Sequence, residues 1–96
     1  MRADYDSEAD ALSIDLIKFD LFERQESVHD TYCQVAFARG VPANVELLTP
    51  SEHLDLLEVA ARRYDLDGAG LLAAAQAALA APDRIVDLEV GARAAA

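Results

Sequence analysis

The chain has few of the residues from which catalytic and metal sites are usually built. Its 96 residues include one cysteine, two histidines and no tryptophan. A single cysteine, Cys33, cannot form an intrachain disulfide, and no basic-then-apolar leader opens the sequence, so a cytoplasmic location is expected. Gly-rich phosphate loops, nucleophile elbows and dinucleotide-binding fingerprints are also missing. The sequence therefore predicts no catalytic residue, no cofactor and no metal site.

Basic residues and long apolar runs are scarce as well. Eight Lys and Arg stand against 18 Asp and Glu, which gives a net charge of −10, and residues 1–30 alone carry nine acids and three bases. Such a charge repels polyphosphate and anionic lipid, so we expect no direct contact with nucleic acid or membrane and favour a basic protein partner. The longest uncharged stretch, residues 68–82, is shorter than the roughly 20 apolar residues of a membrane span.

The length of the chain limits its organisation. Because domains contain from about 50 to 250 residues, residues 1–96 are expected to form a single domain. A domain this small leaves much apolar surface exposed, so a homodimer is expected. Within it we expect β-hairpins over residues 1–48, two helices over 49–82, a strand over 84–90 and a frayed tail over 91–96.

Alternating apolar residues predict the strands. Residues 2–5 form a short candidate strand, followed by an acidic turn over 6–10. Apolar residues then alternate over 12–21, but the alternation slips by one residue at Leu16 and Ile17, which predicts a bulge or bend there. Residues 23–30 are polar and are predicted to form a loop. Residues 31–48 predict a β-hairpin that turns at Arg39 and Gly40.

The second half of the chain has the signals of two helices. Thr49, Pro50 and Glu52 are typical of a capped helix start, and the apolar stripe continues to residue 64. Asp67 is a candidate cap for a second, alanine-rich helix that Pro82 ends. The whole pattern predicts an α+β fold: a small antiparallel sheet of about four strands, with residues 84–90 as a candidate fifth, packed against two α-helices.

Two segments resemble a known family. The sequence YDSEADALSIDL, residues 5–16, resembles the opening of the small prokaryotic family called domain of unknown function 2283. Residues 37–48 are similar to its second hairpin, although Arg39-Gly40 replaces the usual Asp-Gly and Ala43-Asn44 replaces a glycine. The resemblance covers about residues 3–54. It implies a small antiparallel sheet with a following helix and transfers no catalytic residue. Some members of this family lie beside toxin-like genes, which implies an antitoxin or partner-binding role.

Four carboxylates alternate along residues 4–10, with the spacing that begins a calcium-binding loop. A loop of that kind needs glycine at its sixth position and glutamate at its twelfth; counted from Asp6, this chain has Ala11 and Ile17 there. A solvated, turn-forming cluster is therefore the preferred interpretation. Together with one apolar residue outside the strand alternation, these acids form the expected interaction surface: Asp4, Asp6, Glu8, Asp10 and Phe22.

The two histidines permit a second kind of site. His29, Asp30, Cys33 and His53 can be combined into a metal site, but zinc usually requires three or four ligands with recognisable spacing. We expect Cys33 to point into the core, where its thiol is inert.

The leading hypothesis is a homodimeric protein-interaction domain without catalytic activity, which engages a basic partner through its acidic N-terminal hairpin. An antitoxin-like neutraliser of a basic toxin is the alternative in the same class. The alternative from another class is a small-ligand-binding protein or enzyme with a site at the dimer interface, using His29, Asp30 and Tyr32.

Overall fold

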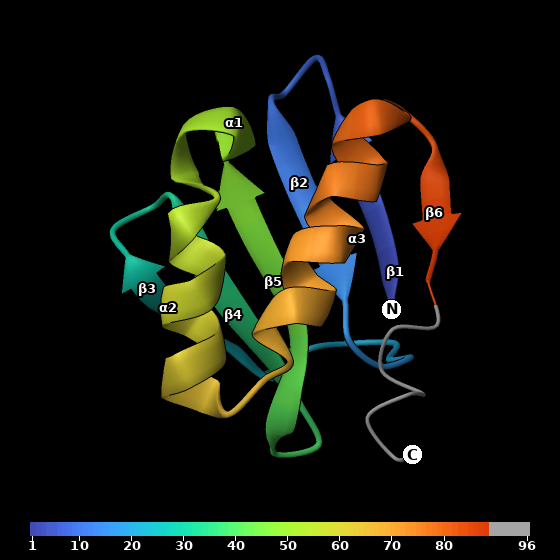
Figure 1. Cartoon of the computed structure of the whole chain (residues 1–96). Coiled ribbons are helices and arrows are strands. Elements are labelled where there is room, and N and C mark those ends of the chain that lie inside the picture. Colours follow the sequence, from blue (N-terminus) through green and yellow to red (C-terminus); the bar gives the residue numbers. More distant parts are fainter. Residues whose placement is uncertain (89–96) are drawn as a thin grey trace.

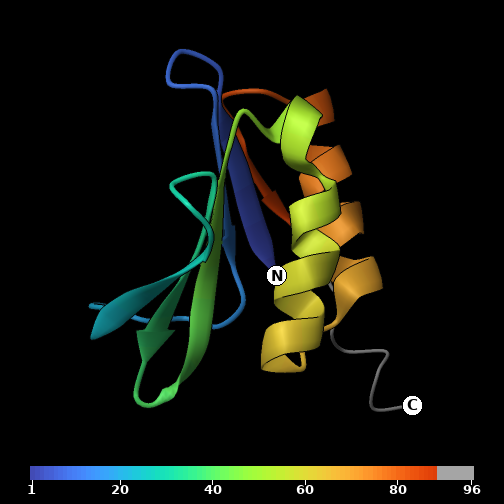
Figure 2. The same ribbon diagram turned by 90° about the vertical axis from the view of Figure 1, so that its left-hand side faces the viewer.

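The computed structural model describes residues 1–88 as one antiparallel sheet with helices on one side of it (Figures 1 and 2). The strands lie in the order β3-β4-β5-β2-β1-β6. The elements are β1 (Arg2–Asp6), β2 (Ala11–Asp15), β3 (Arg24–His29), β4 (Cys33–Ala38), β5 (Val41–Leu48), α1 (Pro50–His53), α2 (Asp55–Tyr64), α3 (Gly68–Ala80) and β6 (Ile85–Asp87). The predicted α+β class is confirmed, but the sheet has six strands instead of four or five, and there are three helices instead of two.

The predicted hairpin over residues 31–48 is confirmed. β4 and β5 pair antiparallel and are joined by Arg39 and Gly40, whose φ angles are 53° and 80°. Two consecutive positive φ angles suit the right-handed twist of a hairpin, and Gly40 adopts this conformation without steric cost. β2 then pairs with β5, which places Leu12 opposite Leu47 and Ile14 opposite Val45, all four buried beneath the helices.

The predicted strand over residues 12–21 is too long, because β2 ends at Asp15. The bend predicted at Leu16 and Ile17 is present: the Leu16 amide still donates to the Ala43 carbonyl, and the chain then leaves the sheet. Residues 16–23 cross to the far edge of the sheet, where the Glu23 amide donates to the Phe37 carbonyl.

The loop predicted over residues 23–30 is instead the edge strand β3. Its sequence is polar because only Val28 is buried, so it lacks the apolar alternation of a half-buried strand. Side chains of α2 hold this edge: the Tyr64 hydroxyl donates to Glu26 at 2.8 Å, and Arg63 donates to the Ser27 carbonyl at 3.2 Å. Contacts with α2 therefore stabilise β3 as a strand, although the sequence of residues 24–29 has no strand pattern.

The first predicted helix is divided at Leu54 into α1 and α2. Thr49 occupies the predicted N-cap position and Pro50 begins the helix as predicted, but the expected side-chain capping bond is not formed. Thr49 has a left-handed backbone with φ of 47°, and its side chain caps nothing. Its carbonyl accepts the Glu52 amide instead, at 3.0 Å. The second predicted cap is confirmed, because the Asp67 side chain accepts the Gly70 amide at 2.9 Å.

The C-terminal strand is shorter than predicted within the described residues. β6 pairs with the outer edge of β1, and the amino group of Met1 donates to the Leu88 carbonyl at 2.7 Å. Residues 89 and 90 of the predicted strand, and the tail predicted to fray over 91–96, lie outside the described residues.

The core lies between the sheet and two antiparallel helices. α2 contacts β3 and β4, whereas α3 contacts β1, β2 and β6. The buried side of α3 includes Ala74, Ala75 and Ala78, each fully inaccessible to solvent. Their short side chains let the helix approach the sheet closely, as its alanine-rich sequence predicts. No helix within residues 1–88 has the length and apolar character needed to cross a membrane.

A larger residue at the contact between α3 and the sheet should destabilise the fold. We expect Ala78→Leu to lower the free energy of unfolding by about 1–3 kcal/mol, because added methylenes force the packed layers apart. Ala80→Leu is the matched control, since Ala80 is exposed on the same helix, and its effect should stay within about 0.5 kcal/mol. Urea unfolding measures both, and equal effects would contradict this account of the core.

Candidate functional site

The acidic turn between β1 and β2 is held by its own carboxylates. Asp6 accepts hydrogen bonds from the backbone amides of Glu8 and Ala9, at 3.0 and 3.2 Å. Asp10 has φ of 52° and accepts a hydrogen bond of 2.7 Å from the Tyr5 hydroxyl, which raises the pKa of that hydroxyl. These are the local bonds with which aspartate closes a turn. Asp6 and Asp10 therefore have structural roles.

A further carboxylate reaches this turn from a distant part of the sequence. Asp83 follows α3 and accepts hydrogen bonds from the Ser7 amide at 2.9 Å and the Ser7 hydroxyl at 2.7 Å. Its own amide donates to the Tyr5 carbonyl. The two bonds from Ser7, the amide first, lower the pKa of Asp83. Sequence reasoning missed this contact, because only the pairing of β6 with β1 brings residues 7 and 83 together.

Asp4 is exposed and alternates along β1 with the buried Ala3, so it lies on the other face of the sheet. Figure 2 shows that the helices of residues 1–88 cover only one face. Asp4 lies opposite Ser13 in the pairing of β1 with β2, and Ser13 lies opposite Glu46 in the pairing of β2 with β5. Asn44 donates hydrogen bonds of 2.8 Å to both Ser13 and Asp15 on the same face. Burial raises the pKa of Asp4, and the charges of Asp15 and Asp6 raise it further. This face is polar and acidic.

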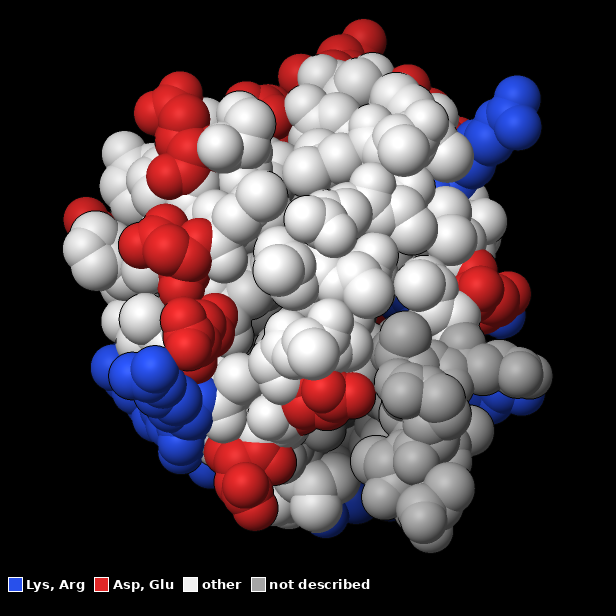
Figure 3. Space-filling model, in the orientation of Figure 1, with Lys and Arg blue, Asp and Glu red and all other residues white. Residues whose placement is uncertain are grey.

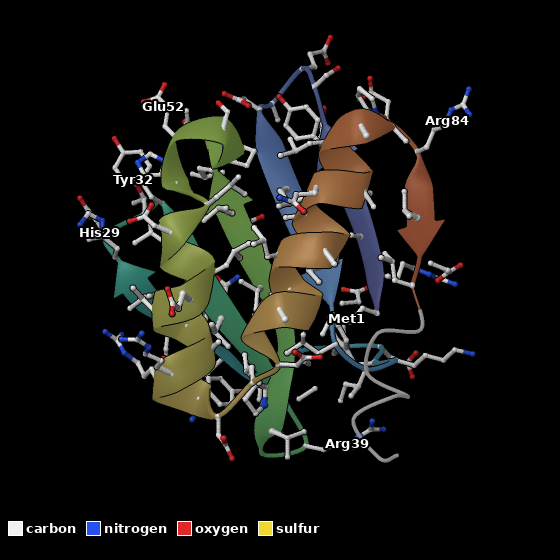
Figure 4. All side chains as sticks on the ribbon, viewed as in Figure 1. Met1, His29, Tyr32, Arg39, Glu52 and Arg84 are labelled. Atoms are coloured by element: carbon white, nitrogen blue, oxygen red, sulfur yellow. The ribbon has the colours of Figure 1, made fainter. Side chains whose placement is uncertain are left out.

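Phe22 lies at the opposite end of the molecule from the acidic turn. It precedes Glu23, whose side chain accepts the Gly40 amide at 3.0 Å in the β4–β5 turn, and Figure 4 places Arg39 of that turn at the lower end of the sheet. Leu21 and Val41 flank the same contact. All three side chains are exposed, at 84% for Leu21, 51% for Phe22 and 47% for Val41. We call these three residues the end patch. The structure thus separates Phe22 from the acids with which the sequence grouped it.

A groove follows the outer seam between α2 and α3. It has a volume of about 470 Å³ and is called the helix groove below. Most of its lining is apolar, and its charged residues are both acidic. The lining residues are Leu54, Asp55, Leu57, Glu58, Gly68, Ala69 and Leu72. Sequence reasoning missed the groove, although the absence of charge from residues 68–80 was a signal for an unusual helix face.

A larger hollow of about 640 Å³ lies beside the ends of β1 and β6. Its lining includes two bases, Arg2 and Lys18, and three acids, Asp15, Asp20 and Asp87. Arg2 is paired with Asp87 at 3.2 Å. Because opposite charges nearly balance there, the hollow favours no class of charged partner.

Both histidines lie beside Tyr32, which connects β3 and β4 (Figure 4). The Tyr32 ring stacks on His53, with centroids 4.3 Å apart, and lies 6.3 Å from the His29 ring. Nδ1 of His53 lies 3.1 Å from the carbonyl oxygens of Leu48 and of Thr49, which it can meet as a donor. Asp30 joins this region only through its carbonyl, which accepts the Ser27 hydroxyl. The sequence groups His29, Asp30 and Tyr32, and it combines His53 with His29 only as a disfavoured metal ligand; the stacking of His53 on Tyr32 is not predicted.

The environment of Cys33 differs from that of the two histidines. It is fully buried in the core, as predicted, whereas His29 is exposed. Burial raises the pKa of the Cys33 thiol to about 11, against a smaller opposite effect of Arg63. Within residues 1–88, no three His, Cys, Asp or Glu side chains are placed to share a metal ion.

Comparison of the chain with protein-family models, with curated proteins and with solved structures found no match. The resemblance of residues 3–54 to the domain of unknown function 2283 family stays a prediction.

Burial should protect Cys33 from thiol reagents. With a pKa of about 11, only about one thiol in a thousand is ionised at pH 8, and the core blocks access to it. We expect no reaction with Ellman's reagent in the native protein and complete reaction in guanidinium. A Ser51→Cys variant supplies the control, since Ser51 is exposed and the new thiol should react at once. Rapid native labelling of Cys33 itself would contradict its placement.

Neutralising Asp4 should stabilise the protein at neutral pH. Because its folded pKa lies above the ordinary value of 3.8, the folded state binds the proton more tightly, and the resulting stability is lost as pH rises through the folded pKa. Asp4→Asn should therefore raise Tm at pH 7, and the difference should vanish below about pH 3. Thermal unfolding across this range measures it, with Asp20→Asn as a charge-matched control. A lower Tm for Asp4→Asn at pH 7 would contradict the destabilisation of the Asp4 charge by burial and by the carboxylates of Asp15 and Asp6.

Proposed function

We propose that this chain is a homodimeric protein-interaction domain without catalytic activity. The observation that carries the proposal is the end patch. Leu21, Phe22 and Val41 are large apolar side chains, and all three are exposed and adjoin, in the sequence, the two residues of one hydrogen bond, from the Gly40 amide to the Glu23 side chain. Exposed apolar residues that gather in this way mark protein contacts, whereas single ones are common on any surface.

The charges around the end patch favour a second copy as its occupant. The flanking loop and turn carry two bases and two acids: Lys18 and Arg39 against Asp20 and Glu23. The chain as a whole carries a net charge of −10, so most of its surface repels another copy. At the end patch, acids of one copy can meet bases of the other across a two-fold axis, since such an axis brings the same patch from both copies together.

The reactive groups of the chain support a role without catalysis. The thiol of Cys33 is buried with a raised pKa, and the ring of His53 is stacked on Tyr32 beside two carbonyls. The alternative of a ligand site at a dimer interface would use His29, Asp30 and Tyr32. These residues lie near His53 and α1, whereas the end patch lies at the other end of β4 and β5 (Figure 4).

Removing the largest side chain of the end patch should weaken the dimer. We expect the wild-type chain to have twice its chain mass in light scattering coupled to gel filtration. Phe22→Ala should raise the dimer Kd by about thirtyfold, which corresponds to about 2 kcal/mol for a central aromatic residue. Val59→Ala is the matched control, because Val59 is also partly exposed, at 40%, but lies on α2. A wild-type chain that stays monomeric throughout a concentration series would overturn the proposal.

A further inference from the structure

Resting on the protein-interaction role above, we propose that the helix groove binds a basic amphipathic helix of another protein. The shape of the groove supplies the first argument. Leu54, Leu57 and Leu72 provide its apolar surface, while Gly68 and Ala69 leave space because they have little or no side chain. Leu72 is 39% exposed, which is unusual for a leucine in the middle of a helix seam. The volume of about 470 Å³ accommodates a few apolar side chains.

The charge at the rim is of one sign. Asp55 and Glu58 line the groove from α2, and α3 contributes no charged residue at all. Figure 3 shows the uncharged surface over α3 bordered on its left by carboxylates over α1 and α2. Glu58 pairs with Arg62 at 2.9 Å, but both side chains are largely exposed, so this pair is weak and its carboxylate stays available. A complementary partner therefore has apolar residues at its centre and lysine or arginine beside them.

This charge pattern disfavours three other occupants: a second copy, nucleic acid and anionic lipid. A second copy placed in the groove would bring its own carboxylates toward Asp55 and Glu58, and each chain already carries a net charge of −10. Nucleic acid and anionic lipid would be repelled by the same rim. The groove and the end patch are also separate surfaces, because the first is formed by α2 and α3 and the second by the loop after β2 and the β4–β5 turn.

The walls of the groove select a helix over a strand. Both walls are helices, whose backbone amides and carbonyls are bonded within each helix, so the groove offers no free edge for an added strand. Binding must rely on side chains, and a helix presents apolar residues to such a groove at positions i, i+3, i+4 and i+7. A lysine or arginine beside the apolar stripe of such a partner helix then lies next to Asp55 and Glu58.

A pair of designed peptides tests the proposal. Both are helical, contain about 15 residues and carry the same leucine stripe, but one has lysine and the other glutamate beside the stripe. Isothermal titration at low salt should show binding of the lysine peptide only, and its Kd should rise by at least fivefold between 50 and 300 mM NaCl because added salt screens the rim. Equal affinities for both peptides, or no binding of the lysine peptide, would overturn the proposal.

Two variants localise the binding to the groove. Asp55→Asn with Glu58→Gln should weaken the lysine peptide by about three- to tenfold. Glu8→Gln with Asp20→Asn changes the net charge by the same amount away from the groove and should have a much smaller effect. Ala69→Phe should fill the groove and abolish binding, because Ala69 is exposed at its lining. Equal losses from both charge pairs, or unaltered binding by a folded Ala69→Phe chain, would refute a specific groove.

Mass measurement separates this result from the proposed dimer. The groove variants should keep the mass of the wild-type chain, and Phe22→Ala should keep the affinity for the lysine peptide. A dimer that persists while the peptide fails to bind would remove the groove proposal alone. A monomer that binds the peptide through the groove would remove the homodimer and retain the groove.

Discussion

The close contact between α3 and the sheet is the constraint on which the rest of the structure depends. Ala74, Ala75 and Ala78 are fully buried there, and contacts of α3 with β1 and β2 require side chains of that size. The same alanine-rich composition continues on the outer side of the helix, where small residues cannot fill the seam with α2. The helix groove therefore results from the small residues that α3 needs for close packing, and it is apolar because α3 has no charged residue.

Local patterns predict the elements that bury one clear apolar face or have a specific turn. The β4–β5 hairpin, the cap at Asp67 and the bend at Leu16 belong to this group, because each depends on neighbouring residues. β3 could not be predicted in this way. Its polar residues become a strand only because β4 offers a free edge and α2 holds it through Tyr64 and Arg63. The division of the first helix at Leu54 has no comparable local signal.

The acidic turn and the end patch depend more strongly on the tertiary structure than the individual helices and strands do. The acidic turn was visible in the sequence, yet the partners of Asp6 and Asp10, and the arrival of Asp83, define what those carboxylates do. The sequence shows Phe22 as an apolar residue outside the alternation, but the bond of its neighbour Glu23 to the β4–β5 turn follows from the crossing of residues 16–23 to the far edge. The acids thus include some that stabilise turns, such as Asp6 and Asp10, and others, Asp55 and Glu58, that line a groove.

The pairing of β6 with β1 has a consequence for folding during synthesis. β1 leaves the ribosome before the other five strands of this sheet, but β6 at its outer edge and α3 on its helix-facing side come more than 60 positions later. Until then β1 and β2 form a hairpin with an open edge and an uncovered apolar face, the kind of surface that pairs with other chains. The acids of the β1–β2 turn place negative charge at the end of this hairpin, and like charges on two copies repel each other.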